Sequence, residues 1–238
     1  MIMKNKVLYF LLLATTVLFT FNSCEKESLG HTNITYYANI ELFGDESVIV
    51  NKGEHFEDPG FKATMNGVDV SGRVTVTSDV DTSKSGVYTV VYSMTNDDGF
   101  ESSVSRTVVV LDLTDPIEGI WAVTPTSFRI YDGGAPVAYG GAYQFLIIGQ
   151  GGGVYFVEDL MAGWYAQRVG YGSNYAMQGK VAIAEDGTIT LQSSAVPGWG
   201  DEADDLTDGK YDAATSTITY KLFYAEVIEF DVTLTKVL

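Results

Sequence analysis

From Thr35 to the last residue, short runs of β-branched and aromatic residues alternate with turn residues, and no other feature constrains the fold as strongly. Val48-Ile49-Val50 and Val104 to Leu111 are typical runs. Asn96-Asp97-Asp98-Gly99 is a hairpin signal, because Asn, Asp and Gly tolerate the positive φ of tight turns. No window of about 12 residues carries the 3.6-residue apolar period of an amphipathic helix. The sequence therefore predicts an all-β protein.

Thr114-Asp115-Pro116 interrupts the strand pattern, since proline cannot donate to a central ladder and restricts the residue before it. We place a domain boundary there, which separates residues 35–112 from residues 116–238. A chain of 238 residues has room for two small domains. In the second domain we expect eight strands: Gly119–Val123, Ser127–Tyr131, Tyr143–Ile148, Val154–Val157, Tyr175–Ala184, Thr188–Gln192, Thr217–Tyr224 and Ile228–Lys236. This number of strands is typical of a small antiparallel barrel or a two-sheet sandwich.

Composition excludes several classes of protein. The chain has 14 Lys and Arg against 31 Asp and Glu, a net charge of −17. We therefore expect no nucleic-acid partner, because phosphate binding requires clustered cationic side chains. One Cys and two His give little support to thiol catalysis, zinc fingers or a disulfide framework.

The first residues have the pattern of an export signal. Lys4 and Lys6 precede an almost unbroken apolar run, Val7 to Phe21. The run is shorter than the roughly 20 residues that a membrane-spanning helix needs, and it suits a secretory signal peptide better. The only Cys, Cys24, follows this run at the position where a bacterial lipoprotein signal peptide is cut and lipidated.

Residues 1–23 resemble a lipoprotein signal peptide ending in a lipobox, with Phe21 and Asn22 in place of the usual Leu and small residue. The resemblance implies lipidation of Cys24 and anchoring to a membrane, followed by a polar tether over residues 24–34. After cleavage, 12 cationic and 31 acidic residues remain, a net charge of −19. A secreted protein with a stray Cys, or an uncleaved anchor helix, are the alternatives.

Glu25 and Glu27 flank Lys26 directly after the lipidation position. This short acidic segment resembles the one that follows the lipidated Cys in surface-exported Bacteroidetes lipoproteins. We therefore expect export, a lipid anchor in the outer membrane, and exposure at the cell surface.

Residues 35–112 resemble a bacterial immunoglobulin-like (Ig-like) domain. The resemblance is carried by Gly53 to Phe61, Val80 to Tyr92, Asn96 to Gly99 and Arg106 to Val110. It implies a β-sandwich of two packed sheets without a disulfide. Such modules serve mainly as spacers. Alternate residues of one strand share a face, so we expect the following side chains to belong to the core: Tyr88, Val90 and Tyr92.

The opening Gly119-Ile120-Trp121 and Lys236 in the last strand of the second domain resemble the ends of lipocalin-like barrels. We expect Trp121 to be part of the core. An Ig-like module followed by such a domain resembles small Bacteroidetes lipoproteins, whose genes often lie beside outer-membrane glycan-uptake systems. A lipocalin-like carrier of an apolar ligand would need an internal cavity, lined by residues such as Phe145, Ile147 and Phe156.

The densest run of charge is the acidic segment from Gly200 to Asp208. Calcium takes six to eight oxygen ligands, which clustered carboxylates on a loop can supply. A solvated acidic loop without a cofactor is the favoured interpretation, and calcium is the one cofactor that the segment leaves as an alternative. The candidate ligands are Asp201, Asp204, Asp205 and Asp208.

Catalytic patterns are weak. His31 falls in the tether and His55 in a turn of the Ig-like domain, and no Gly-x-Ser-x-Gly elbow is present. The glycine run from Gly149 to Gly153 lacks the Lys and Ser or Thr of a phosphate-binding loop and predicts a hairpin. Paired carboxylates for glycoside hydrolysis leave no sequence signature, because their separation is three-dimensional. We expect a protein that is not an enzyme.

Aromatic residues in irregular segments are the candidate ligand-binding groups. Trp199 lies between Gly198 and Gly200, which offer no side chains to cover the indole. Rings of this kind stack on the apolar faces of sugars while neighbouring amides and acids bind the hydroxyls. The alternative is that the rings close the end of a barrel. The candidate binding residues are Trp164, Tyr171 and Trp199, with polar help from Gln167, Asn174 or Asp201.

These features together predict a non-catalytic, lipid-anchored cell-envelope protein whose second domain binds a glycan or a partner in a nutrient-uptake assembly. Outer-membrane transporter components are the expected protein partners. The alternatives are the lipocalin-like carrier and a purely structural accessory lipoprotein.

Overall fold

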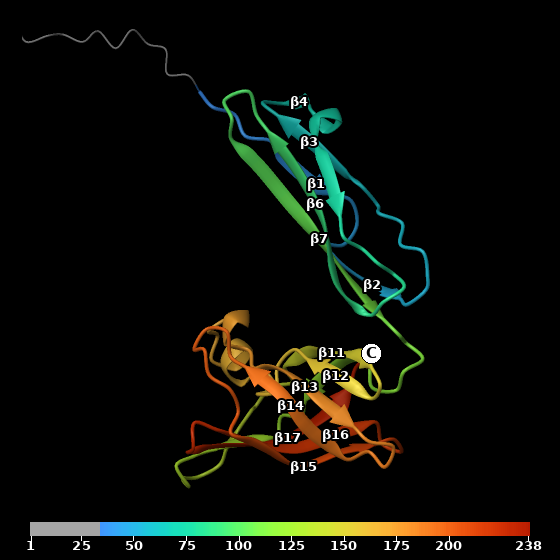
Figure 1. Ribbon diagram of the computed structural model, residues 1–238. Coiled ribbons are helices and arrows are strands. Elements are labelled where there is room, and N and C mark those ends of the chain that lie inside the picture. The colour runs from blue at the N-terminus through green and yellow to red at the C-terminus, as the bar shows by residue number, and fades with distance from the viewer. Residues whose placement is uncertain (1–33) are drawn as a thin grey trace, which may run out of the picture. The chain divides into compact units, whose positions relative to one another are not determined.

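The computed structural model describes residues 34–238, so the predicted signal peptide, Cys24 and His31 lie outside the described residues. Almost all of the regular secondary structure in the described chain is β-strand (Figure 1), and the predicted all-β class is confirmed. No helix within the described range is long and apolar enough to cross a membrane.

The N-terminal part of the described chain forms two sheets, as the Ig-like resemblance implies. One sheet has the order β1 (Asn39–Leu42), β3 (Phe61–Met65), β4 (Val68–Asp69). The other has the order β2 (Ser47–Asn51), β7 (Glu101–Leu111), β6 (Gly86–Thr95), β5 (Thr75–Ser78), and the short 3₁₀ turn η1 spans Ser71–Arg73. β2 runs parallel to β7, and the other pairs are antiparallel. Val90 and Tyr92 are buried and Tyr88 packs against the same core, as expected.

A buried arginine ties the Ig-like motif together. Arg106 on β7 has no exposed surface, and its Nε lies 3.2 Å from Oδ1 of Asp58. The guanidinium also donates to the carbonyl oxygens of Phe43, Gly60 and Asp45, while the Tyr92 hydroxyl donates to Asp58 at 2.7 Å. A buried charge is costly unless it is paired and fully hydrogen-bonded. The segment Asp58-Pro59-Gly60 therefore has a structural role, because it supplies two of the groups that bind the buried Arg106.

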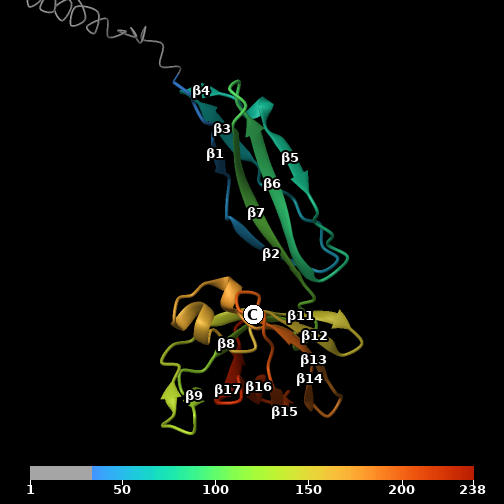
Figure 2. The same cartoon turned by 60° about the vertical axis from the view of Figure 1, so that its left-hand side comes forward.

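The C-terminal part forms one antiparallel sheet that curls into a half-barrel (Figure 2). The strand order along the main path is β10-β9-β17-β8-β11-β12-β13-β14. In addition, β16 pairs with β17, and β15 pairs with β16. An isolated bridge joins Thr188, the residue before β14, to Lys210 of β15. The elements are β8 (Gly119–Val123), β9 (Phe128–Tyr131), β10 (Val137–Ala138), β11 (Gln144–Gly151), β12 (Val154–Val157), η2 (Trp164–Arg168), η3 (Ser173–Tyr175), β13 (Gln178–Ile183), β14 (Ile189–Ala195), β15 (Asp205–Asp212), β16 (Thr217–Tyr224) and β17 (Ile228–Lys236).

The sheet has ten strands where the sequence predicted eight. β8, β12, β16 and β17 begin and end where expected, whereas β10 and β15 were not predicted. β15 was not predicted because its acidic sequence was interpreted as part of a loop. Leu206 and Tyr211 of this strand are buried, and a bulge between Thr207 and Lys210 breaks the two-residue alternation that identifies a strand in sequence.

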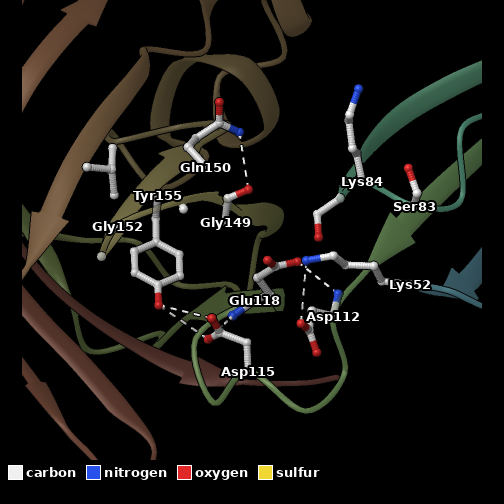
Figure 3. Close-up of a pocket in the computed structure, with 14 residues that line it drawn as sticks. Lys52, Ser83, Lys84, Asp112, Asp115, Glu118, Gly149, Gln150, Gly152 and Tyr155 are labelled. Carbon is white, nitrogen blue, oxygen red and sulfur yellow. Dashed lines mark hydrogen bonds and ion pairs between the residues drawn. The ribbon is translucent and has the colours of Figure 1, made fainter.

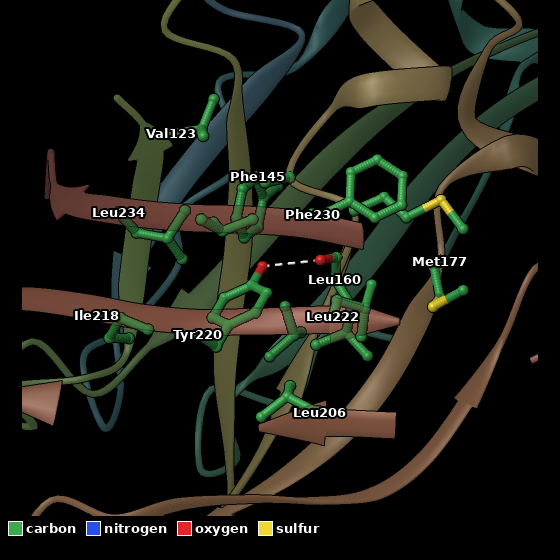
Figure 4. Packing of buried hydrophobic residues seen from close by; sticks show 14 of the residues in the cluster. Val123, Phe145, Leu160, Met177, Leu206, Ile218, Tyr220, Leu222, Phe230 and Leu234 are labelled. Atoms are coloured by element: carbon green, nitrogen blue, oxygen red, sulfur yellow. Dashed lines mark hydrogen bonds between the residues drawn. The ribbon is translucent and has the colours of Figure 1, made fainter. Parts of the chain in front are cut away.

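Apolar side chains fill the inside of the half-barrel (Figure 4). Trp121 has no exposed surface, and its Nε1 donates to the Ile117 carbonyl at 2.8 Å. Its predicted core role is confirmed. Phe230, Leu222 and Leu234 from β16 and β17 are buried to the same degree. This packed interior stabilises the curled sheet, which positions the surface residues described below.

Candidate functional site

Five rings from three segments, the stretch from η2 to η3, the β14–β15 loop and the end of β16, form a surface aromatic group: Tyr165, Tyr171, Tyr175, Trp199 and Tyr224. Trp199 is its centre. Ring centroids lie 4.9 Å away for Tyr165, 5.0 Å for Tyr175, and 6.2 Å for both Tyr171 and Tyr224. The Tyr224 ring stacks on the indole at an interplanar angle of 21°, while the other three meet it edge to face or tilted. Aromatic pairs at such distances and angles attract one another beyond simple burial.

The group is exposed at its outer rings. Tyr171 is 54% exposed and Trp199 is 41% exposed, so the predicted exposure of Trp199 is confirmed. Tyr224 is buried beneath Trp199, and its hydroxyl donates to Oδ2 of Asp201 at 2.7 Å. Burial, with the nearby Asp201 carboxylate, raises the pKa of Tyr224 and keeps it a neutral donor. Sequence reasoning missed Tyr224, because it ends a regularly alternating strand and looked like a core residue.

Hydrogen bonds between loops hold Trp199 in place. The Gly198 N–H donates to the Asn174 carbonyl at 2.7 Å, which joins the β14–β15 loop to η3. Val196 N–H donates to the Asp201 carbonyl, and the N–H groups of Trp199 and Gly200 donate back to the Val196 carbonyl. The indole is thus presented by a closed turn whose geometry depends on a contact with a distant segment.

Trp164 was predicted to stack on a ligand, and the structure corrects this. It is only 2% exposed, with Tyr139 edge-on at 4.9 Å and Phe230 at 6.1 Å. Trp164 therefore fits the alternative interpretation, in which an aromatic ring closes the end of the barrel. Trp164 is the first residue of the π-helical turn η2, and its ring is buried in the core. The next residue, Tyr165, belongs to the surface aromatic group.

The three polar residues predicted to assist binding have different positions relative to Trp199. Asn174 is exposed, and its backbone carbonyl holds the Trp199 loop. Gln167 points elsewhere, since its side-chain amide donates to the Gln144 carbonyl at 2.6 Å. Asp201 lies at the surface aromatic group through its bond to Tyr224. The structure therefore brings Asn174 and Asp201 to Trp199, and gives Gln167 a structural bond.

The predicted calcium site is not formed by the described residues, where no group of three or more acids, His or Cys is arranged to hold a metal. Asp201 binds the Tyr224 hydroxyl, and Asp204 accepts the Glu226 N–H at 2.7 Å. Asp205 and Asp208 belong to β15, with Asp208 at a positive φ of 53° beside the bulge. Within the described residues these carboxylates therefore do not gather into one set of ligands.

The lipocalin-like cavity is also absent from the described half-barrel. Phe145 and Ile147 are buried in the packed core, while Phe156 packs with Ile148 in a separate cluster. The cavity among the core residues measures about 20 Å³. Ligand pockets are typically about 300–1,000 Å³, so this space holds little more than one water molecule.

A polar pocket of about 480 Å³ is lined in part by the hairpin Gly149–Gly153 and by the chain around Asp112 and Asp115 (Figure 3). The predicted hairpin is confirmed, since it joins β11 to β12. Most charges here are already paired. Lys52 lies 3.6 Å from Asp112, and the Tyr155 hydroxyl donates to Asp115 at 3.1 Å. The surface aromatic group is therefore the stronger candidate site.

Comparisons with known proteins agree with the two-part fold. The model of the bacterial surface protein Ig-like domain matches residues 40–110, and a family model of a C-terminal domain matches residues 110–236. The crystal structure of the lipoprotein BT2262 from Bacteroides thetaiotaomicron is 38% identical, with a TM-score of 0.71, over 84% of this chain and 100% of that chain. The chain belongs to the family of this lipoprotein. The predicted resemblance to Bacteroidetes lipoproteins is thereby confirmed.

Another solved structure is only remotely similar to this chain. A Clostridium perfringens ZmpB structure, CBM51-2 in complex with GlcNAc and INT domains, is 23% identical with a TM-score of 0.26. It covers 50% of this chain and 31% of that chain, and a likeness this low carries no argument about fold or ligand. No curated protein matches the chain.

Proposed function

We propose that this protein is a non-catalytic lipoprotein of the bacterial cell envelope, anchored to the outer membrane through Cys24 and exposed at the cell surface. Its C-terminal domain binds a glycan, within an assembly that includes outer-membrane transporter components. The observation that carries the proposal is the surface aromatic group, in which Trp199 and Tyr171 remain about half exposed on a base of packed tyrosines.

Glycan binding suits this group for a physical reason. Exposed rings are costly in water unless something covers them, and the C–H faces of sugar rings stack on indole and phenol rings. The ring contacts and the Gly198 bond hold Trp199 in position before any ligand arrives, so little conformational entropy is lost on binding. The Asp201 carboxylate, which accepts from the Tyr224 hydroxyl, lies beside the rings as a partner for hydroxyl groups.

Trp199→Ala in the chain from residue 25 onward tests the proposal on a glycan array, with calorimetry on the hits. We expect affinity to fall about thirtyfold, since truncating an aromatic hot spot costs about 2 kcal/mol. The melting temperature should change little, because the core does not include Trp199. Phe100→Ala, which removes a ring that is 49% exposed on the Ig-like part, is the matched control and should leave binding unchanged. Unaltered affinity in Trp199→Ala would place the glycan site elsewhere.

A further inference from the structure

Two arginines without acidic partners pack on Trp164, the residue before Tyr165 of the surface aromatic group. Arg129 on β9 and Arg168 at the end of η2 both place the guanidinium against Trp164, with Cζ 5.0 and 4.1 Å from the ring centroid. Within residues 34–238, neither forms an ion pair with a carboxylate. The chain has 31 acidic residues for only 14 Lys and Arg, so two neighbouring unpaired guanidinium groups are unexpected.

Arg129 is the more constrained of the two. It lies opposite Phe230 in register, so its side chain leaves β9 on the face that carries the core. Its Nε is buried without a hydrogen-bond partner among the described residues, and Nη1 donates to the Tyr165 hydroxyl at 3.3 Å. The flanking Glu229 pairs instead with Lys221 at 3.1 Å. A partly buried charge that stacking and one hydroxyl alone satisfy is costly unless a ligand completes it.

Arg168 supplies the second, more accessible charge. Its Nε donates to the Tyr139 carbonyl at 3.0 Å, which fixes the guanidinium over Trp164, and the residue is exposed. The Nη groups form no further hydrogen bond within the described chain and are free to meet a ligand. Sequence reasoning did not find this pair, because the two residues are 39 positions apart on a strand and a helical turn.

We infer that Arg129 and Arg168 bind the anionic substituent, a carboxylate or a sulfate, of an acidic sugar that stacks on the surface aromatic group. A guanidinium presents its N–H groups as a planar fork that matches both anions. Tyr165 connects the two parts of the site, since it accepts from Arg129 and its ring lies 4.9 Å from Trp199. The repulsion between an acidic protein and an anionic glycan is screened beyond about 8 Å at physiological salt, so local contacts decide.

This inference rests on the proposed glycan binding, and matched ligands separate the two. Calorimetry with the chain from residue 25 onward compares tetragalacturonate, its neutral methyl ester and a κ-carrageenan tetrasaccharide, whose only anionic groups are sulfates. We expect at least one anionic probe to bind about tenfold more tightly than the ester, through charge-assisted hydrogen bonds. A preference for the first or the third probe distinguishes carboxylate from sulfate recognition.

Arg129→Gln and Arg168→Gln should each abolish this preference, while Lys221→Gln, which removes an ion-paired cation from β16, should retain it. Arg129→Lys keeps the positive charge and replaces Arg129→Gln in the experiment if the glutamine variant unfolds at a lower temperature.

Equal affinity for ester and acid, or a preference that survives the arginine variants, overturns the inference but leaves a Trp199-dependent glycan site standing. Binding of none of these probes, nor of any glycan on the array, overturns the proposed function as well. Arginine-dependent binding of a poly-glutamate peptide without any glycan binding would reassign the pair to an acidic protein.

Discussion

Asp159 is a carboxyl group that the C-terminal domain buries almost completely, with 1% of its surface exposed. Its Oδ1 accepts the N–H groups of Met161 and Met177, and Oδ2 accepts that of Gly163. These bonds fold the turn that leads into η2 and join it to the start of β13. Burial raises the pKa of Asp159 to about 7, and the three N–H donors offset part of that rise.

We predict that Asp159→Asn changes how stability depends on pH. The folded protein holds the Asp159 proton more tightly than the unfolded chain, whose carboxyl has a pKa of 3.8. This group therefore contributes stability below about pH 4 that is lost as pH rises through about 7. Urea unfolding should show wild type losing a few kcal/mol relative to Asp159→Asn between pH 5 and pH 8. A difference that is the same at both pH values would contradict the assignment.

At the scale of elements, the surface aromatic group depends on how two loops meet. Gly198 is the contact point. A Cβ placed there would lie 2.7 Å from Cε1 of Tyr175 and 2.9 Å from the Asn174 carbonyl oxygen. Only glycine lets the backbone of the β14–β15 loop approach η3 so closely.

Gly198→Ala should therefore separate these loops and disturb the rings while the core stays intact. We expect a loss of about 1–3 kcal/mol in the free energy of unfolding, typical of overpacking. The near-ultraviolet circular dichroism of the aromatic group should weaken, and glycan affinity should fall together with it. Gly72→Ala is the control, because nothing lies within 4 Å of a Cβ at that position. An unchanged spectrum in Gly198→Ala would show that the loops tolerate the methyl group.

At the scale of the whole molecule, the proposed location depends on one atom, the Cys24 sulfur. We predict that Cys24→Ala moves the protein from the outer-membrane fraction to the soluble fraction, because stable anchoring requires two acyl chains. Labelling with a palmitate analogue should mark the wild type and the control Ser23→Ala, and should leave Cys24→Ala unlabelled. Label on the Cys24→Ala protein would refute lipidation at this residue.

Local patterns were enough to predict much of the molecule. Alternation and turn residues predicted the all-β class, the Ig-like part and the bounds of β8, β12, β16 and β17, because a strand buried on one face needs a two-residue period. The flanking glycines predicted that Trp199 is exposed. Each of these properties depends on residues within a few positions of one another.

Contacts between distant segments decided the rest. Trp164 and Trp199 both lie in irregular, glycine-rich sequence, yet one is buried and the other exposed, because Phe230 and Tyr139 cover only the first. β15 became a strand despite its carboxylates because β16 offered it a hydrogen-bonded edge. Arg129 and Arg168 met only when β9 and η2 came together over Trp164. Burial and charge at one position depend on which segments pack there, and the sequence around that position does not contain this information.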